Sequence, residues 1–147
     1  MWCLADSKTS YIVNFEIYTG KCNGNQSSEP LGERVVLKLT HELEGIESLV
    51  AFDNFFTSVN VVDALCKKDI YSVGTVRTNR KGLPEIMKEK KKLQRGEYEY
   101  RTKNNIRAIK WMDSKIVTVL SSAHNPLTVT TVKRTLKTDK RIIQDLG

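Results

Sequence analysis

The sequence predicts an α/β fold in which a mixed sheet is followed by a basic, β-rich region. Apolar residues alternate with polar ones over residues 11–18, as in a half-buried strand, and they recur at helical spacing over residues 32–44. After Arg77, helical spacing gives way to three short runs that are rich in β-branched and aromatic residues. The expected divisions are a core at 1–77, a basic β-rich region at 78–141 and a tail at 142–147.

The first half of the core is predicted to be a hairpin followed by a helix. Residues 2–5 and 11–18 are expected to be antiparallel strands, because the polar residues 6–10 between them suit a turn. Residues 20–30 form a polar loop, and a helix is expected over residues 32–44. One stripe of this helix carries Val35, Val36, Leu39 and Leu43.

The second half of the core is predicted to be strand, helix and strand. Residues 48–52 form a short, largely buried strand, and a further strand is expected at residues 70–76. Between them, Thr57 or Ser58 is the expected N-cap of a helix that ends near Lys68.

The region after Arg77 is predicted to consist mainly of strands. Residues 83–92 form a short basic helix or loop, and residues 128–132 supply an additional edge strand. Turn residues at 104–105 and 113–114 separate three strands, which therefore form a meander. These strands lie at 98–101, 106–111 and 116–120.

Asp53 is the strongest candidate for a functional residue. It directly follows the strand at residues 48–52. A carboxylate at the C-terminal end of a strand in an α/β sheet lies in the usual crevice for ligands and metals. From position alone, the alternative is that the side chain only accepts hydrogen bonds from loop amides.

Seven short segments carry a resemblance to a known family. In order they are Ala5-Asp6-Ser7-Lys8-Thr9-Ser10-Tyr11, Tyr18-Thr19-Gly20-Lys21, Leu31-Gly32-Glu33-Arg34-Val35-Val36, Asp53-Asn54-Phe55-Phe56-Thr57-Ser58, Val73-Gly74-Thr75-Val76-Arg77-Thr78-Asn79-Arg80, Leu83-Pro84-Glu85 and Leu120-Ser121-Ser122. Each is weak alone, but together and in this order they are specific. Over nearly its whole length the chain resembles the transposase domain of the piggyBac family.

The resemblance implies a DDE/D DNA transposase with a ribonuclease H-like core. In such enzymes three carboxylates hold two Mg²⁺ ions, which activate the attacking water or 3′-hydroxyl. The resemblance aligns Asp53 with the second aspartate, so Asp53 is the expected catalytic and metal-binding residue. The Asp-Glu motif of the first aspartate and the Gly-Gly-Val-Asp motif of the third do not occur here. Asp6 falls outside the triad, and the neighbours of Asp145 do not match.

The predicted fold is therefore a partial ribonuclease H-like mixed sheet. Its first strand and its C-terminal helices are missing, and the β-rich region at 78–141 corresponds to an insertion in the catalytic core of the family. Such a piece lacks two of the three carboxylates that the chemistry needs.

The charge of the chain is divided unevenly. The net charge is +7; residues 1–76 carry 6 Lys/Arg and 10 Asp/Glu, whereas residues 77–147 carry 18 Lys/Arg and 7 Asp/Glu. A basic surface favours nucleic acid, because neutralising phosphates releases counterions. The family resemblance implies that Arg77 and Arg80 approach DNA near the active site, with Lys81 beside them. The alternative is a solvated turn.

Several classes of protein are excluded by the sequence. No apolar run approaches the roughly 20 residues of a membrane span. The first residues lack a secretory signal, and the three widely spaced cysteines favour a reducing compartment over a disulfide framework. The resemblance implies a nuclear protein, DNA as the partner, and homodimers in the family.

Three interpretations remain open. The leading one is a truncated transposase domain that cannot cut DNA alone. The alternative is a non-catalytic DNA-binding module that uses the basic C-terminal half. A third is that the chain is an incomplete translation of a locus that encodes an entire transposase.

Overall fold

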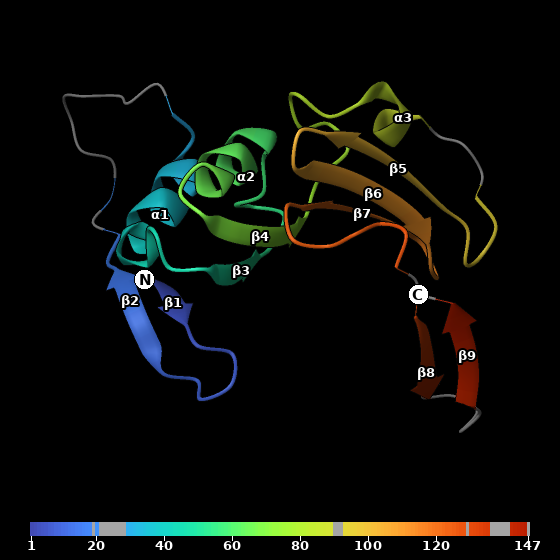
Figure 1. Cartoon of the computed structure of the whole chain (residues 1–147), viewed down its shortest axis with the longest axis horizontal. Helices are drawn as coiled ribbons and strands as arrows, with labels where there is room; N and C mark the ends of the chain where they lie inside the picture. Colours follow the sequence, from blue (N-terminus) through green and yellow to red (C-terminus); the bar gives the residue numbers. More distant parts are fainter. Residues whose placement is uncertain (19, 21–28, 90–92, 129, 136–141, 147) are drawn as a thin grey trace.

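The computed structural model describes residues 1–18, 20, 29–89, 93–128, 130–135 and 142–146 (Figure 1). Its helices are α1 (Leu31–Leu39), α2 (Val59–Cys66) and α3 (Glu85–Lys88), with a 3₁₀ turn η1 (His41–Leu43). Its strands are β1 (Trp2–Ala5), β2 (Ile12–Glu16), β3 (Ser48–Phe52), β4 (Ile70–Thr75), β5 (Tyr98–Lys103), β6 (Ile106–Met112), β7 (Ile116–Ser121), β8 (Thr131–Thr135) and β9 (Ile142–Leu146). The order predicted for the core, strand, strand, helix, strand, helix, strand, is confirmed.

A five-stranded mixed sheet in the order β3-β4-β7-β6-β5 forms the centre of the fold. β3 pairs with β4 in parallel, and α2 makes the connection between them. The predicted meander is confirmed, since β5, β6 and β7 pair antiparallel in sequence order. β7 also pairs with β4, where Gly74 lies opposite Leu120. The strands before and after residue 77 therefore belong to one sheet.

The described helices lie on one face of this sheet (Figure 1). The apolar side chains of α2 divide between two clusters on that face. Val61 packs with Val50 and Ile70, whereas Val62 packs with Met87 and Leu120. Burial of the two clusters holds α2 over β4 and brings its N-terminus close to the end of β3, because burying apolar surface is the main driving force of folding.

The other face of the sheet carries partly exposed apolar side chains. On β3 and β4, Leu49 and Tyr71 are 55% and 40% exposed. They occupy paired positions in the ladder, so they lie side by side. Within the described part of the chain, this face has no helix over it (Figure 1).

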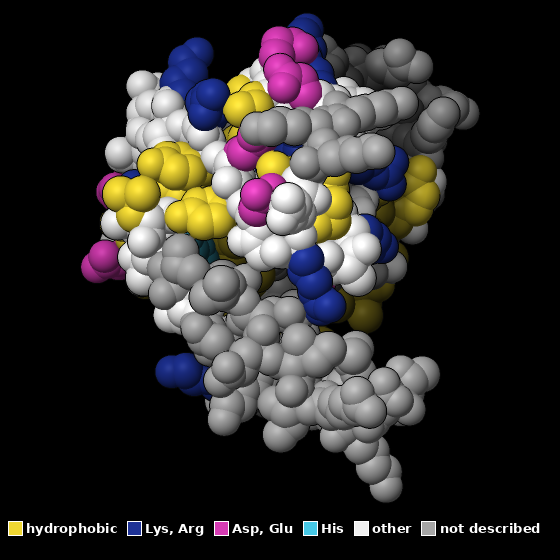
Figure 2. Space-filling model, turned by 90° about the vertical axis from the view of Figure 1, so that its right-hand side faces the viewer, with side chains coloured by type: hydrophobic (Ala, Val, Ile, Leu, Met, Phe, Trp, Pro, Cys, Tyr) yellow, Lys and Arg dark blue, Asp and Glu magenta, His cyan; other side chains and the backbone are white. Residues whose placement is uncertain are grey.

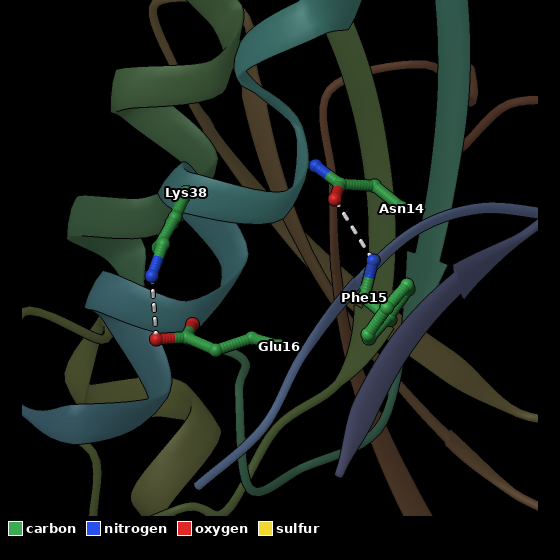
Figure 3. A network of polar contacts seen from close by, with 4 residues as sticks. All are labelled: Asn14, Phe15, Glu16 and Lys38. Carbon is green, nitrogen blue, oxygen red and sulfur yellow. Dashed lines mark hydrogen bonds and ion pairs between the residues drawn. The ribbon is translucent and has the colours of Figure 1, made fainter.

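The β1–β2 hairpin contacts α1 through polar side chains of β2 (Figure 3), while Leu4 of β1 packs against the apolar cluster that contains Val36. Lys38 Nζ lies 2.8 Å from Glu16 Oε1, and Asn14 Nδ2 donates to the carbonyl of Leu39 at 3.2 Å. The apolar stripe predicted for residues 11–18 therefore does not form a buried face. Phe15 and Ile17 are 57% and 63% exposed, because the face that meets α1 is the one with Asn14 and Glu16.

Two elements differ in extent or pairing from their predictions. The helix expected over 32–44 ends at Leu39, where the Thr40 hydroxyl donates to the Val36 carbonyl at 2.8 Å and the chain tightens into η1. The edge strand expected at 128–132 is wrong. β8 begins at Thr131 and pairs with β9, at residues 142–146, in a separate two-stranded sheet and not with the five-stranded sheet.

Candidate functional site

Asp53 lies directly after β3 and is exposed. Its Oδ1 accepts a hydrogen bond from the backbone N–H of Phe55 at 2.8 Å. Its carbonyl accepts from the N–H of Phe56 at 3.2 Å and from the N–H and hydroxyl of Thr57 at 3.1 and 2.7 Å. These bonds close a tight turn, which we call the Asp53 loop (residues 53–57).

Ser58 joins the Asp53 loop to the start of α2. Of the two N-caps expected from the sequence, Ser58 is the one observed, since its Oγ accepts from the N–H of Val61 at 3.1 Å. The same hydroxyl donates to Glu33 Oε1 at 2.8 Å. Glu33 belongs to α1, so the start of α2 is tied to the neighbouring helix.

Two glycines allow other elements to approach this turn closely. At Gly74 on β4, an added Cβ would meet Thr57 Oγ1 and would lie 2.6 Å from the carbonyl oxygen of Phe52. At Gly32 on α1, it would lie 2.9 Å from the carbonyl oxygen of Phe55. Side chains at either position would collide with backbone, which is why glycine occupies both.

Arg77 and Arg80, from the connection between β4 and α3, also reach the Asp53 loop. Arg77 Nε donates to Asn54 Oδ1 at 3.1 Å. Arg80 Nη2 donates to the carbonyls of Asn54 and Phe55 at 3.1 and 2.8 Å. Lys81 is exposed, and no hydrogen bond joins it to the described residues. The structure therefore bonds two of the three expected basic residues, Arg77 and Arg80, to the loop that follows Asp53, whereas Lys81 makes no such contact among the described residues.

The carboxylates of the described residues do not gather into a metal centre. Among them, no group of three or more His, Cys, Asp and Glu side chains is arranged to hold an ion. Asp6 lies in the β1–β2 turn and is bonded to its neighbours Lys8 and Thr9. Asp145 is on β9, opposite Val132. The described part of the chain thus offers Asp53 alone, which does not fit a pair of Mg²⁺ ions.

Basic side chains are spread over the second half of the chain. Figure 2 shows Lys and Arg side chains scattered around apolar ones on the side that is at the right in Figure 1. Arg101, Lys103 and Lys115 are exposed, whereas Lys110 is 1% exposed and contributes nothing to this surface. The three lysines at 90–92 and most of the lysine-rich stretch at 133–141 lie outside the described residues.

The sequence analysis assigned no role to Asn54, which lies in the Asp53 loop, or to Gly74, which packs closely against Thr57 of that loop. Gly74 left a recognisable signal, because a glycine inside a strand often marks a close backbone approach. No local sequence pattern points to Asn54, because its side-chain amide accepts a hydrogen bond from Arg77, 23 residues away.

Comparison with known proteins decides the family. The family model described as Transposase IS4 matches residues 1–146. The chain belongs to this transposase family. It is 34% identical over 132 residues to PiggyBac transposable element-derived protein 2 of Homo sapiens, covering 84% of this chain and 22% of the relative. It is 36% identical over 131 residues to PiggyBac transposable element-derived protein 3 of Homo sapiens, covering 82% and 21%.

A solved structure extends the similarity to three dimensions. The chain matches a piggyBac transposase in a synaptic complex with hairpin DNA, determined by cryo-EM, with a TM-score of 0.77 and 26% identity. The match covers 87% of this chain and 27% of that one. The resemblance to piggyBac transposases is therefore confirmed. The chain spans about a fifth of the length of the curated relatives. No helix in its described residues has the length and apolarity to cross a membrane.

Proposed function

We propose that this chain is part of the catalytic domain of a DDE/D-type DNA transposase and does not cut DNA alone. In this proposal Asp53 is the second of three metal-binding carboxylates. The supporting observation is that Asp53 is exposed at the end of β3 while the loop behind it is fixed by α1, α2 and the β4–α3 connection. A catalytic carboxylate requires this combination of access and rigidity.

The fold assigned to this domain is a partial ribonuclease H-like sheet. Two free strand edges support this assignment, since β1 pairs only with β2 and β3 pairs only with β4 among the described strands. The partly exposed sheet face at Leu49 and Tyr71 is likewise a surface that additional helices would cover.

A complete site of this class would use Mg²⁺ to activate the attacking oxygen and stabilise the leaving one. Magnesium demands near-octahedral oxygen ligation, and one exposed carboxylate supplies little of it. No cleavage step is therefore assigned to this chain.

A nicking assay tests the lack of cleavage. Supercoiled plasmid and a hairpin-ended duplex are incubated with the chain and Mg²⁺ or Mn²⁺. We expect no metal-dependent nicking from the parent, from Asp53→Ala or from the control Asp63→Asn on α2. Nicking by the parent that persists in the control and disappears in Asp53→Ala would refute the proposal.

DNA is the proposed partner, and the proposed compartment is the nucleus. Arg77, Arg80 and Lys81 would lie nearest the phosphates, because the two arginines contact the Asp53 loop and Lys81 follows Arg80 in sequence. A second candidate function is a non-catalytic DNA-binding module. It is favoured by the positive charge of residues 77–147, which contain 18 basic and 7 acidic residues. Both functions need phosphate contacts, but only the first needs Asp53.

Salt-dependent binding tests the DNA contact. Each phosphate contact that is lost lowers the slope of log affinity against log salt by about 1. We expect Arg77→Ala with Lys81→Ala to reduce that slope by about 2. The control removes the same charge from the acidic half, by Lys8→Ala with Lys67→Ala, and should leave the slope unchanged. Binding that does not depend on salt would exclude the DNA contact.

A further inference from the structure

Arg77 and Arg80 are bonded to the protein itself, which gives them a role beyond contributing charge. We propose that they are positioning residues that hold the backbone after Asp53 and thereby fix the direction of its carboxylate. The inference rests on the proposed function of Asp53.

One peptide group links Arg80 to Asp53. The carbonyl of Asn54 accepts a hydrogen bond from Arg80 Nη2 at 3.1 Å. The N–H of the same peptide group, which belongs to Phe55, donates to Asp53 Oδ1 at 2.8 Å. Because a peptide group is planar, a bond that fixes its carbonyl also fixes its N–H. The guanidinium therefore sets the position of the amide that orients the carboxylate.

The next carbonyl is held from two sides. Phe55 O accepts from Arg80 Nη2 at 2.8 Å, and an added Cβ at Gly32 would lie 2.9 Å from it. The carbonyl is therefore confined between a guanidinium and the backbone of α1. Such charge-assisted bonds are stronger than those between neutral groups.

Arg77 adds a second attachment through the side chain of Asn54, with 3.1 Å between its Nε and Asn54 Oδ1. Arg77 and Arg80 thus hold the same residue by its side chain and by its backbone. Arginine suits this role because its planar fork presents several fixed donors, whereas lysine presents one flexible ammonium.

Lys81 is a natural control for charge. It is adjacent to Arg80 and exposed, and no hydrogen bond joins it to the described part of the protein. Replacing Lys81 removes a positive charge next to Arg80 in sequence without removing a bond to the Asp53 loop. Arg80→Lys keeps the positive charge but removes the guanidinium that donates to the loop carbonyls.

Amide hydrogen exchange measured by NMR tests, without DNA or metal, whether Arg80 holds the Asp53 loop. We call this set of bonds from Arg80 to the loop the clamp. In Arg80→Lys we expect the Phe55 amide hydrogen to exchange about tenfold faster than in the parent. The reason is that the Asn54 and Phe55 carbonyls lose their bonds to the charged guanidinium. The Leu65 amide on α2 should be unchanged, which shows that the fold is intact, and Lys81→Ala should match the parent at both positions. Exchange of Phe55 in Arg80→Lys within twofold of the parent would overturn the clamp.

Mn²⁺ alone serves as a probe of the carboxylate, through paramagnetic broadening of the Asn54 and Phe55 amide signals. If Arg80 positions Asp53, Arg80→Lys should need about tenfold more Mn²⁺ for equal broadening, as when a residue supporting a metal ligand is lost. Lys81→Ala should need no more than the parent, because it keeps both arginines that hold the loop. Equal broadening in Arg80→Lys and the parent would overturn the positioning role. Absence of broadening in the parent would fit a site with a single carboxylate, and hydrogen exchange would then decide whether Arg80 holds the loop.

Discussion

The buried ammonium of Lys110 donates a hydrogen bond of 2.8 Å to the backbone carbonyl of Glu89. The same Nζ donates to the carbonyl of Ile86 at 3.1 Å, and Lys110 is 1% exposed. The two carbonyls lie in and just after the short helix α3, where carbonyls lack partners within the helix. Lys110 therefore attaches α3 to the sheet.

We expect Lys110→Met to lower the free energy of unfolding by about 2 kcal/mol, because two carbonyls lose a charged donor while most of the side-chain volume is kept. Urea unfolding followed by circular dichroism measures this. The control is Lys88→Met on α3, whose surface pair with Glu85 should contribute about 0.5 kcal/mol or less. Equal stability of Lys110→Met and the parent would show that the attachment is not needed.

A second prediction concerns the close approach at Gly74. Gly74→Ala places a Cβ against Thr57 Oγ1 and 2.6 Å from the Phe52 carbonyl, so β4 or the Asp53 loop must shift. We expect a loss of about 1–3 kcal/mol, as for other overpacked positions. Thr75→Ala, at the exposed neighbouring position, is the control and should change stability by about 0.5 kcal/mol or less. Thermal unfolding of the three proteins measures both, and a stable Gly74→Ala would contradict the packing described for β4.

A third prediction concerns the pKa of Asp6 in the β1–β2 turn. The pKa of Asp6 is held below its usual value of 3.8, first by the hydrogen bond from the Thr9 hydroxyl and then by the backbone N–H of Lys8. A carboxyl group whose pKa is lowered by folding stabilises the fold above its unfolded pKa. That contribution is lost as the pH falls through the folded pKa.

Thr9→Val should raise the pKa of Asp6 toward its usual value, whereas Thr9→Ser keeps the hydroxyl and should leave it low. A ¹³C carboxyl titration by NMR measures the pKa directly. Unfolding measured below pH 3.8 should show less acid sensitivity in Asp6→Asn than in the parent. An unchanged pKa in Thr9→Val would show that the hydroxyl is not the main cause.

Local sequence patterns were sufficient for the elements around Asp53. The bounds of β3, α2 and β4 lie within two residues of those predicted. Each element has a short apolar pattern, and the cap at Ser58 marks the start of α2. The orientation of the β1–β2 hairpin was not predictable. Its alternating pattern identifies two faces, but which face is buried depends on the polar partners that α1 offers.

The candidate site was predictable in part. The motif around Asp53 and the basic residues at 77–81 are contiguous in sequence, so both could be named from it. The bonds between them join residues more than 20 positions apart and follow from the packing of β4 beside β3. The pairing of β8 with β9 was not predicted either, although the two strands follow each other in sequence, because a strand pattern does not specify its partner.

The last prediction separates two roles of Ser58. Its Oγ caps α2 by accepting from Val61 N–H and also donates to Glu33 Oε1 on α1. Ser58→Ala should lower the free energy of unfolding by about 1–2 kcal/mol, since loss of an N-cap alone typically costs about 1. An aspartate at this position can accept the hydrogen bond from Val61 N–H, so Ser58→Asp retains the cap. It cannot donate to Glu33, and the two carboxylates repel each other.

A double-mutant cycle with Glu33→Ala then isolates the link between α1 and α2. The coupling free energy from Ser58→Ala, Glu33→Ala and the double variant should be about 0.5–1.5 kcal/mol. This is the range for a partly buried hydrogen bond to a charged group. In the Glu33→Ala background, Ser58→Asp should recover most of the stability of Ser58, because the repulsion is gone. Zero coupling would mean that the hydroxyl acts only as a cap and that Glu33 does not tie α2 to α1.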